Sequence, residues 1–347
     1  MIVEILLTNG IKGYGESYQS AYVPELTDFT IKYLAVFFKK KSINDALKII
    51  ENFRIPFVSQ SGFVKSIFSS FEIALCDAKS KSLRIPFSKY LNKKYNRNEV
   101  KAYASGGSVV FKIKDLKKDI KKIKKIGLDL YKMRIGFYKF KQDIKRINFV
   151  KNKIGEKNLM IDSIMGTLNK WNLKEVKKKI IILNKFKLQW LEEPFPTEKI
   201  FDYKKLKKIS KNPIAIGEAF TNFYEFENVI KNNLCDIVQP DLTQLGIKDA
   251  TKVVKLAKKF KKKVALHVWG SPISLMCNLH FALAHKEVDI IEYPLVRLDF
   301  LSNLMDQNII ISKNKISLKN KKPGLGFNLN NNFLKRFKFI NNSGFKL

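Results

Sequence analysis

From about residue 100 onward, short apolar stretches alternate with longer segments in which apolar residues recur every three or four positions. The apolar stretches begin 22 to 30 residues apart, which is the length of one strand–helix unit. Eight such units predict a parallel (β/α) barrel, and the absence of GxGxxG after the first stretch disfavours the alternative, a doubly wound open sheet. The predicted strands are KAYAS (101–105), YKMRI (131–135), LMID (159–162), QWLEE (189–193), IAIGE (214–218), DIVQPD (236–241), VALHVW (264–269) and IIEYP (290–294).

Residues 1–100 follow a different pattern. Residues 1–17 alternate between apolar and polar positions around Asn9-Gly10, which predicts a β-hairpin, and helical periodicity follows, for example over 66–82. We therefore predict an α+β domain over residues 1–100 and a barrel domain over 101–300. The segment from about 300 to 347, which contains PGLGF (323–327), is expected to extend the first domain.

Composition adds little about partners. The chain has 66 Lys and Arg against 31 Asp and Glu, a formal net charge of +35, but the lysines are spread along the chain. We interpret the lysines as residues on the solvent-exposed faces of helices. We expect no nucleic-acid partner, although nucleic-acid binding through this charge is kept as a minor hypothesis. Three separate cysteines predict reduced thiols in a cytoplasmic protein: Cys76, Cys235 and Cys277. We see no membrane span and no signal peptide.

Ionisable residues gather at the ends of the predicted strands, where (β/α) barrels carry their chemistry. A single acid after a strand is most often a helix N-cap, but caps do not explain the whole series. From the second strand to the eighth, the series is Lys132 and Arg134, Asp162, Glu192 or Glu193, Glu218, Asp241, His267, and Glu292.

Three of these acids follow three consecutive strands and would converge into an all-oxygen site: Asp162, Glu192 and Glu218. Oxygen ligands suit Mg²⁺ first and Mn²⁺ second, and the lack of a neighbouring His or Cys disfavours zinc. Such a cation can bind a substrate carboxylate and stabilise the negative charge that forms when its α-proton leaves.

His267 is one of three histidines and ends a predicted strand, where an imidazole can act as a general base. Asp241 ends the preceding strand and can orient the ring through its other nitrogen. His280 and His285 lie in the next helical segment, and we interpret both as ordinary helix residues.

Together these motifs resemble the enolase superfamily, in its mandelate racemase-like branch, over nearly the whole chain. The motifs are YKMRIG, LMID, WLEEPF, AIGEAF, DIVQPDLTQLGI, LHVWGSP and IIEYP, with KGYGES and PGLGF at the two ends. The resemblance implies a (β/α)7β TIM-like barrel under an α+β capping domain. It implies metal ligands at Asp162, Glu192 and Glu218, a His267–Asp241 dyad, and a substrate contact from Glu292. HVWGSP and IIEYP are most similar to sugar-acid dehydratases and sugar-lactone cycloisomerases.

The chain departs from the family pattern at three places. Lys132-Met133-Arg134 stands where Lys-x-Lys is usual, and a permanently protonated arginine is an anion clamp rather than a base. Ile164 replaces an Asn that often follows the first metal ligand. Met1 falls where the second capping strand would begin, so the first strand and its mobile loop are missing from this sequence. Either the start codon is assigned too late or the protein lacks part of its lid.

We therefore predict a Mg²⁺-dependent lyase or isomerase acting on a small carboxylate or lactone, a homo-oligomer by family resemblance. In this hypothesis Lys132 and Arg134 hold the carboxylate, and the arginine favours β-elimination of water over racemisation. A racemase or epimerase of the same family and a catalytically degraded homologue are the alternatives. Because side chains alternate along a strand, we predict that Glu192 and Glu193 have different roles. The resemblance implies that Glu192 is the metal ligand and that Glu193 points to the other side.

Overall fold

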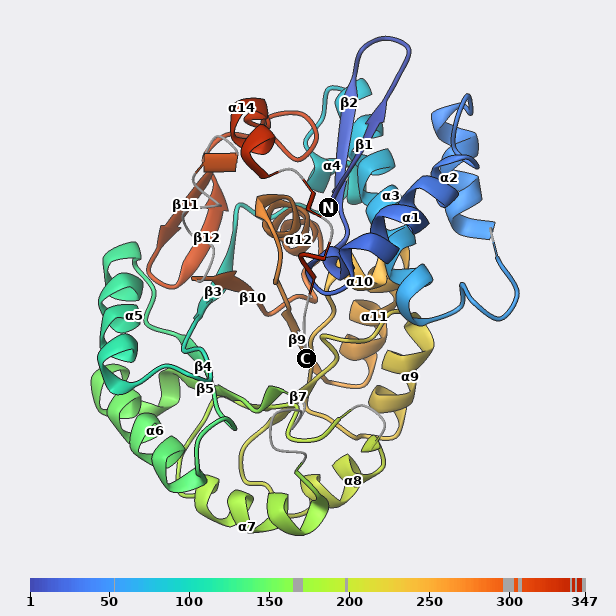
Figure 1. Ribbon diagram of the computed structural model, residues 1–347. Coiled ribbons are helices and arrows are strands. Elements are labelled where there is room, and N and C mark those ends of the chain that lie inside the picture. The colour runs from blue at the N-terminus through green and yellow to red at the C-terminus, as the bar shows by residue number, and fades with distance from the viewer. Residues whose placement is uncertain are drawn as a thin grey trace.

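The computed structural model describes residues 1–52, 54–164, 171–196, 199–295, 303–304, 308–337, 339–340 and 342–344. Its main feature is a ring of eight parallel strands, β3 to β10, closed by pairing of β10 with β3 (Figure 1). The prediction of a closed (β/α)7β barrel is confirmed. The strands are β3 (Glu99–Ser105), β4 (Tyr131–Arg134), β5 (Leu159–Asp162), β6 (Leu191–Glu192), β7 (Ile214–Ile216), β8 (Ile237–Val238), β9 (Lys263–Leu266) and β10 (Ile290–Pro294).

Helices connect successive strands and cover the outside of the ring (Figure 1). Their apolar faces pack on the outward residues of the strands, and their lysines face solvent, as the periodicity predicts. They are α5 (Ile113–Ile126), α6 (Phe140–Ile154), η2 (Glu156–Asn158), α7 (Leu173–Leu183), α8 (Asp202–Lys207), α9 (Phe223–Lys231), α10 (Leu242–Leu245), α11 (Ile247–Lys259) and α12 (Pro272–Ala284).

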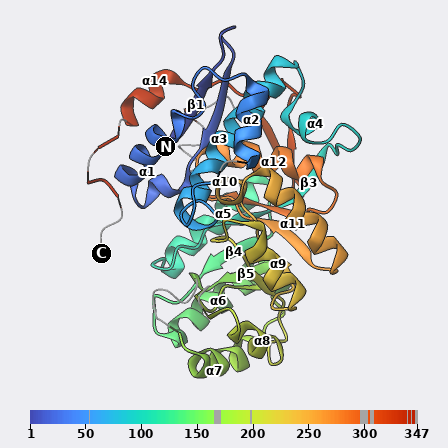
Figure 2. The same cartoon turned by 90° about the vertical axis from the view of Figure 1, so that its right-hand side faces the viewer.

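The N-terminal residues form a smaller α+β layer across one end of the barrel (Figure 2). The predicted hairpin is present, because β1 (Ile2–Leu6) pairs antiparallel with β2 (Lys12–Glu16). Gly13 and Gly15 let β2 lie directly on α3, since a Cβ at either position would come within 2.1 Å of an α3 carbonyl oxygen. The helices are η1 (Tyr18–Ala21), α1 (Pro24–Ala35), α2 (Ile43–Asn52), α3 (Gly62–Ser82) and α4 (Phe87–Leu91).

The C-terminal segment contacts both parts of the molecule. A hairpin of β11 (Ile309–Ser312) and β12 (Lys315–Leu318) adds to the sheet when β12 pairs antiparallel with β3. Further on, Leu325 N–H donates to Asp77 of α3 at 2.8 Å. The chain then forms α14 (Asn331–Leu334) and η5 (Lys335–Phe337). The domain boundary near residue 100 stays a prediction.

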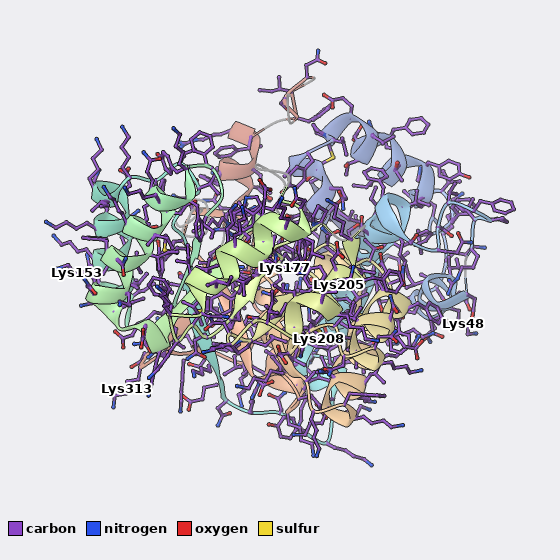
Figure 3. All side chains as sticks on the ribbon, turned by 90° about the horizontal axis from the view of Figure 1, so that it is seen from below. Lys48, Lys153, Lys177, Lys205, Lys208 and Lys313 are labelled. Atoms are coloured by element: carbon purple, nitrogen blue, oxygen red, sulfur yellow. The ribbon has the colours of Figure 1, made fainter. Side chains whose placement is uncertain are left out.

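Lysines point outward around the whole periphery of the molecule. Seen from below, the labelled side chains come from different parts of the chain (Figure 3): Lys48, Lys153, Lys177, Lys205, Lys208 and Lys313. In the part of the chain that the structure describes, no helix combines the length and apolar character that a membrane crossing requires.

Candidate active site

The inside of the barrel is lined by a layer of apolar side chains, one for each strand or its approach. Its members are Tyr103, Leu130, Met160, Trp190, Ala215, Ile237, Ala265 and Ile290. Two residues further along a strand the side chain faces inward again. In five cases that next inward residue is one of the predicted site residues: Lys132, Asp162, Glu192, His267 and Glu292. Strand alternation therefore places these ionisable side chains in the next inward-facing layer after the apolar one.

Strand register then sets the neighbours. Arg134 is aligned with Asp162, and Asp162 is aligned with Glu192. Glu218 reaches the same place by another route, because Gly217 has a φ of +125° and interrupts the strand alternation after β7. A Cβ at Gly217 would lie 2.6 Å from the Phe226 ring. A side chain is therefore excluded at 217, and Glu218 is left to face the cavity.

The three predicted metal ligands do converge. Asp162, Glu192 and Glu218 each offer an oxygen, and these atoms all lie within 4.8 Å of one another. Burial and the charge of Glu192 raise the pKa of Asp162 above its usual value. Burial and the charge of Asp162 raise the pKa of Glu218 to about 7. Crowded, buried carboxylates of this kind suit a hard divalent cation, so the donor set fits Mg²⁺.

Lys132 lies among these acids and is fully buried. Its Nζ donates to Glu192 Oε1 at 2.6 Å and lies 3.1 Å from Glu292 Oε1 and 3.9 Å from Asp162 Oδ2. Burial alone would lower the pKa of Lys132, but Glu192 and Glu292 raise it well above its usual value. The ammonium group is thus a fixed positive charge among the acids.

His267 and Asp241 form the predicted dyad. Their Nδ1 and Oδ2 atoms are 2.8 Å apart, and both side chains are buried. Asp241 is also the N-cap of α10, where its other oxygen accepts from Thr243 N–H at 2.8 Å. Asp241 is therefore a helix cap in any case, and its role as the partner that orients His267 stays a prediction. His267 Nε2 faces the metal-ligand cluster, 3.4 Å from Glu218 Oε2.

Glu292 lies between Lys132 and His267. Its Oε2 accepts from Val268 N–H at 3.0 Å and lies 3.8 Å from His267 Nε2. Burial would raise the pKa of Glu292, but Lys132 and His267 lower it to about 2. Burial would likewise lower the pKa of His267, but Glu292, Glu218 and Asp241 together raise it to about 9.

Arg134 lies at the edge of the site in a fixed position. Its guanidinium donates to Gly106 O at 3.0 Å and Ser105 Oγ at 3.2 Å, and its Nε lies 3.4 Å from Asp162 Oδ2. The group also lies 4.5 Å from the centre of the Trp269 ring. These contacts hold the cation beside the cavity.

The fourth barrel strand, predicted as QWLEE (189–193), differs in part from its prediction. Only Leu191 and Glu192 are strand, and Glu193 has a φ of +38°, so strand alternation was the wrong reason for separating the two acids. The separation itself exists, because Glu193 Oε1 accepts from Gly217 N–H at 2.8 Å, away from Lys132 and Trp190. Burial and the charge of Glu218 raise the pKa of Glu193 well above its usual value.

A cavity of about 260 Å³ lies over these groups. Arg134, Asp162, Glu218 and His267 line it, and Ile164 lies in its wall as the sequence comparison with the family suggested. Tyr18 and Tyr22 enter from the N-terminal layer with hydroxyl oxygens 3.0 Å apart. Sequence reasoning missed these tyrosines, because no pattern marks a residue that only the docking of η1 carries into the site.

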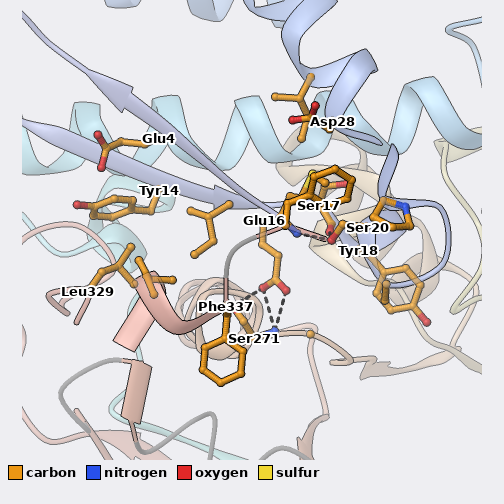
Figure 4. Close-up of a pocket in the computed structure, with 18 of the residues that line it drawn as sticks. Glu4, Tyr14, Glu16, Ser17, Tyr18, Ser20, Asp28, Ser271, Leu329 and Phe337 are labelled. Atoms are coloured by element: carbon orange, nitrogen blue, oxygen red, sulfur yellow. Dashed lines mark hydrogen bonds between the residues drawn. The ribbon is translucent and has the colours of Figure 1, made fainter. Parts of the chain in front are cut away.

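A second cavity of about 800 Å³ adjoins the first, and Tyr18 and Trp269 line both. The close-up shows Glu16 between the hairpin and the barrel (Figure 4). Its carboxylate accepts from Ser271 N–H at 2.8 Å and from Ser274 N–H at 3.1 Å, at the start of α12. The N-terminal layer is thereby fixed to the barrel beside the site.

The fold and the site define a barrel protein in which a cluster of carboxylates that could hold a metal ion faces a histidine–aspartate pair. The model of the enolase C-terminal domain-like family matches residues 115–333, so the chain belongs to that family. It is 27% identical over 334 residues to an L-talarate/galactarate dehydratase of Salmonella typhimurium, covering 95% of this chain and 80% of that one.

Solved structures agree. The 3,6-anhydro-D-galactonate cycloisomerase of Zobellia galactanivorans superposes with a TM-score of 0.86 at 25% identity, over 97% of this chain and 93% of that one. A mutant L-talarate/galactarate dehydratase liganded with Mg and L-glucarate superposes with a TM-score of 0.85 at 26% identity, over 98% and 83%. These three relatives are thus two sugar-acid dehydratases and one cycloisomerase. The roles of individual residues in this chain stay predictions.

Proposed function

We propose that the protein is a Mg²⁺-dependent enzyme that removes the proton α to a carboxylate of a sugar acid or a sugar lactone. The result is loss of water from the acid or isomerisation of the lactone. The observation that carries this proposal is the distance of 3.4 Å between His267 Nε2 and Glu218 Oε2, because it brings a base against the ligand cluster at one cavity. The dehydratases and cycloisomerases above support the substrate class.

Asp162, Glu192 and Glu218 would hold the cation. Bound there, Mg²⁺ would supply electrostatic stabilisation for the charge that develops on the substrate carboxylate. Partial neutralisation of the three acids would also lower the pKa of His267, which carboxylates raise in their charged state. A base with a lower pKa is unprotonated, and so ready to accept a proton, at neutral pH.

The proton is transferred at His267 Nε2. Asp241 accepts from the Nδ1–H, which leaves the Nε2 lone pair directed at the cavity. The α-carbon gives its proton to Nε2, and the C–H electron pair moves toward the carboxylate. In a dehydration the imidazolium then returns a proton to the leaving β-hydroxyl group, so that water departs and the ring is neutral again.

Lys132 and Glu292 form a buried pair of opposite charges beside the ligand cluster. The buried ammonium of Lys132 stabilises developing negative charge, and Glu292 stays ionised because Lys132 and His267 lower its pKa. Arg134 binds one end of the substrate at the cavity wall. It stays protonated, so it cannot serve as a second base.

One base predicts proton transfer on one face of the substrate. Racemisation needs a base on each face, so the arrangement of His267 and Arg134 favours elimination or isomerisation over the racemase alternative. The decisive experiment is a screen of acid sugars and their lactones with Mg²⁺ in D₂O, which follows both product and deuterium incorporation. His267→Asn is the control variant.

We expect turnover or α-deuterium exchange with the native protein and neither with His267→Asn. Deuterium exchange without net reaction would show an active base with an unsuitable substrate. Mg²⁺ binding without exchange across the whole library would contradict the proposal and favour the degraded homologue. The same preparations, passed over a sizing column, test the further proposal that the protein is a homo-oligomer.

A further inference from the structure

The metal-ligand carboxylates are held in very different ways. Glu192 receives three side-chain donors: Lys132 Nζ on Oε1 at 2.6 Å, and Trp190 Nε1 and Gln239 Nε2 on Oε2 at 2.9 and 2.7 Å. Glu218, by comparison, pairs with His267 Nε2 at the longer distance of 3.4 Å. Glu192 is thus oriented by side-chain donors before any cation arrives, whereas Asp162 Oδ1 accepts from the backbone N–H of Ile164 at 2.7 Å.

The two donors on Oε2 are themselves fixed in the barrel interior. Trp190 is buried and packs edge-on against Tyr103, with ring centres 5.1 Å apart. Gln239 is fully buried, and its backbone N–H donates to Ile216 O at 3.0 Å. Neither side chain can turn away without leaving a buried carboxylate oxygen short of donors, which is unfavourable.

The acceptor capacity of each oxygen decides what Glu192 can offer. A carboxylate oxygen has about two acceptor sites. Trp190 and Gln239 occupy both sites on Oε2, whereas Lys132 occupies one on Oε1. One acceptor site, on Oε1, is left for a cation.

We propose that Trp190 and Gln239 make Glu192 a one-oxygen ligand and thereby make the site select Mg²⁺ over Ca²⁺. The inference rests on the proposed metal role of Glu192. Mg²⁺ requires six oxygens in a tight octahedron, whereas Ca²⁺ takes six to eight and commonly uses both oxygens of a carboxylate. A carboxylate that can present only one oxygen denies Ca²⁺ its additional contact, and freeing Oε2 would restore it.

The test measures cation affinity by calorimetry in the absence of substrate. The variants are Trp190→Phe, which keeps the ring and removes its N–H, and Gln239→Met, which keeps the length and removes the donor. Mg²⁺ affinity should fall about 10- to 100-fold in each variant, as for loss of other groups that orient a metal ligand. Ca²⁺ affinity should stay constant or rise, so the Mg²⁺/Ca²⁺ ratio falls by at least the same factor.

Matched controls use the same residue types outside the site. Trp171→Phe and Gln244→Met replace a buried tryptophan and a buried glutamine that contact Lys179 and Gln19, respectively. Both should leave the ratio unchanged. Circular dichroism identifies any variant that fails to fold, and either Trp190→Phe or Gln239→Met alone is enough for the test.

Glu192→Gln separates the two levels of the argument. If this variant binds Mg²⁺ as the native protein does, the metal site itself is wrong. If Glu192→Gln loses Mg²⁺ but Trp190→Phe and Gln239→Met keep the native Mg²⁺/Ca²⁺ ratio, the metal site stands and the selectivity proposal is overturned.

Discussion

Two histidines lie on consecutive elements, His267 after β9 and His280 in α12. Both are buried, but their pKa values are shifted in opposite directions. Burial lowers the pKa of His280 to about 4. For His267 burial acts in the same sense, but Glu292, Glu218 and Asp241 outweigh it and raise the pKa to about 9. Charge in the surroundings therefore decides which buried histidine can exchange a proton near neutral pH.

The surroundings of His280 are neutral backbone groups. Its Nδ1 accepts from Ser88 N–H at 3.1 Å, and its Nε2 lies 3.2 Å from Leu325 O, to which the neutral ring donates. A second proton on the ring would sit on Nδ1 and would place the Nδ1–H against the Ser88 N–H, so that two donors face each other. His280 therefore joins α12 to α4 and to the C-terminal segment as a neutral ring, whereas His267 is available for chemistry.

The largest effect is expected from removing charge beside His267. Glu218→Gln should abolish Mg²⁺-dependent turnover, by at least about 10³-fold, because several kcal/mol of electrostatic stabilisation are lost. The far-UV circular dichroism spectrum should stay unchanged, since Gly217 and not Glu218 fixes the turn. Glu227→Gln on exposed α9, where the acid contacts Lys231, is the control. Retained activity in Glu218→Gln would rule out the metal assignment.

A smaller loss is expected from Asp241→Asn. An amide can donate to Nδ1 and so favour the tautomer with Nε2–H, which cannot accept a proton. The rate of α-proton exchange should fall about 10²- to 10⁴-fold while Mg²⁺ affinity changes little. Exchange kinetics in D₂O and calorimetry measure the two quantities. Loss of Mg²⁺ binding in proportion to the rate would show that Asp241 acts through the fold of α10 instead.

His280 should make the protein less stable in mild acid. Its folded pKa of about 4 lies below the unfolded value of about 6.5, so stability is fully present above pH 6.5 and is lost as pH falls toward 4. The loss amounts to roughly 3 kcal/mol for a shift of this size. Denaturant unfolding of native protein and His280→Gln at pH 7 and 4.5 measures the difference. The native protein should lose more stability than the variant, and parallel losses would contradict the pKa.

The smallest effect is expected from His285→Gln. Burial also lowers the pKa of His285, but Phe281 O, 3.0 Å from Nδ1, and Glu287 favour the charged ring. The part of the acid sensitivity that this variant removes should therefore be smaller than the part that His280→Gln removes. The same pair of unfolding curves measures it, and an effect equal to that of His280 would show that burial alone sets these values.

Much of the fold and of the candidate site could be predicted from the sequence. The spacing of apolar stretches predicts the barrel, and the acids at strand ends predict the ligand cluster, because parallel strands end on one side of a barrel. Strand lengths were less predictable. β6 and β8 contain two residues each, because the chain leaves the ladder before Glu193 and Pro240.

The contacts that tune the site could not be predicted. Gln239 meets Glu192 across strands, and its amide could equally have bonded to water or backbone in another register. A polar residue inside the apolar stretch DIVQPD is the only signal that could have marked it. The side on which Glu193 lies depends on a left-handed backbone angle that no residue type in EEP demands.

Glu16 has a consequence for how the protein is made. Its carboxylate is completed by Ser271 and Ser274, and Glu72 of α3 likewise accepts from Ile247 N–H at 2.8 Å. During synthesis both acids leave the ribosome long before these partners exist. These contacts between the N-terminal layer and the barrel can therefore form only after residues 247–274 have been synthesised, and until then both carboxylates have no protein donors at these positions.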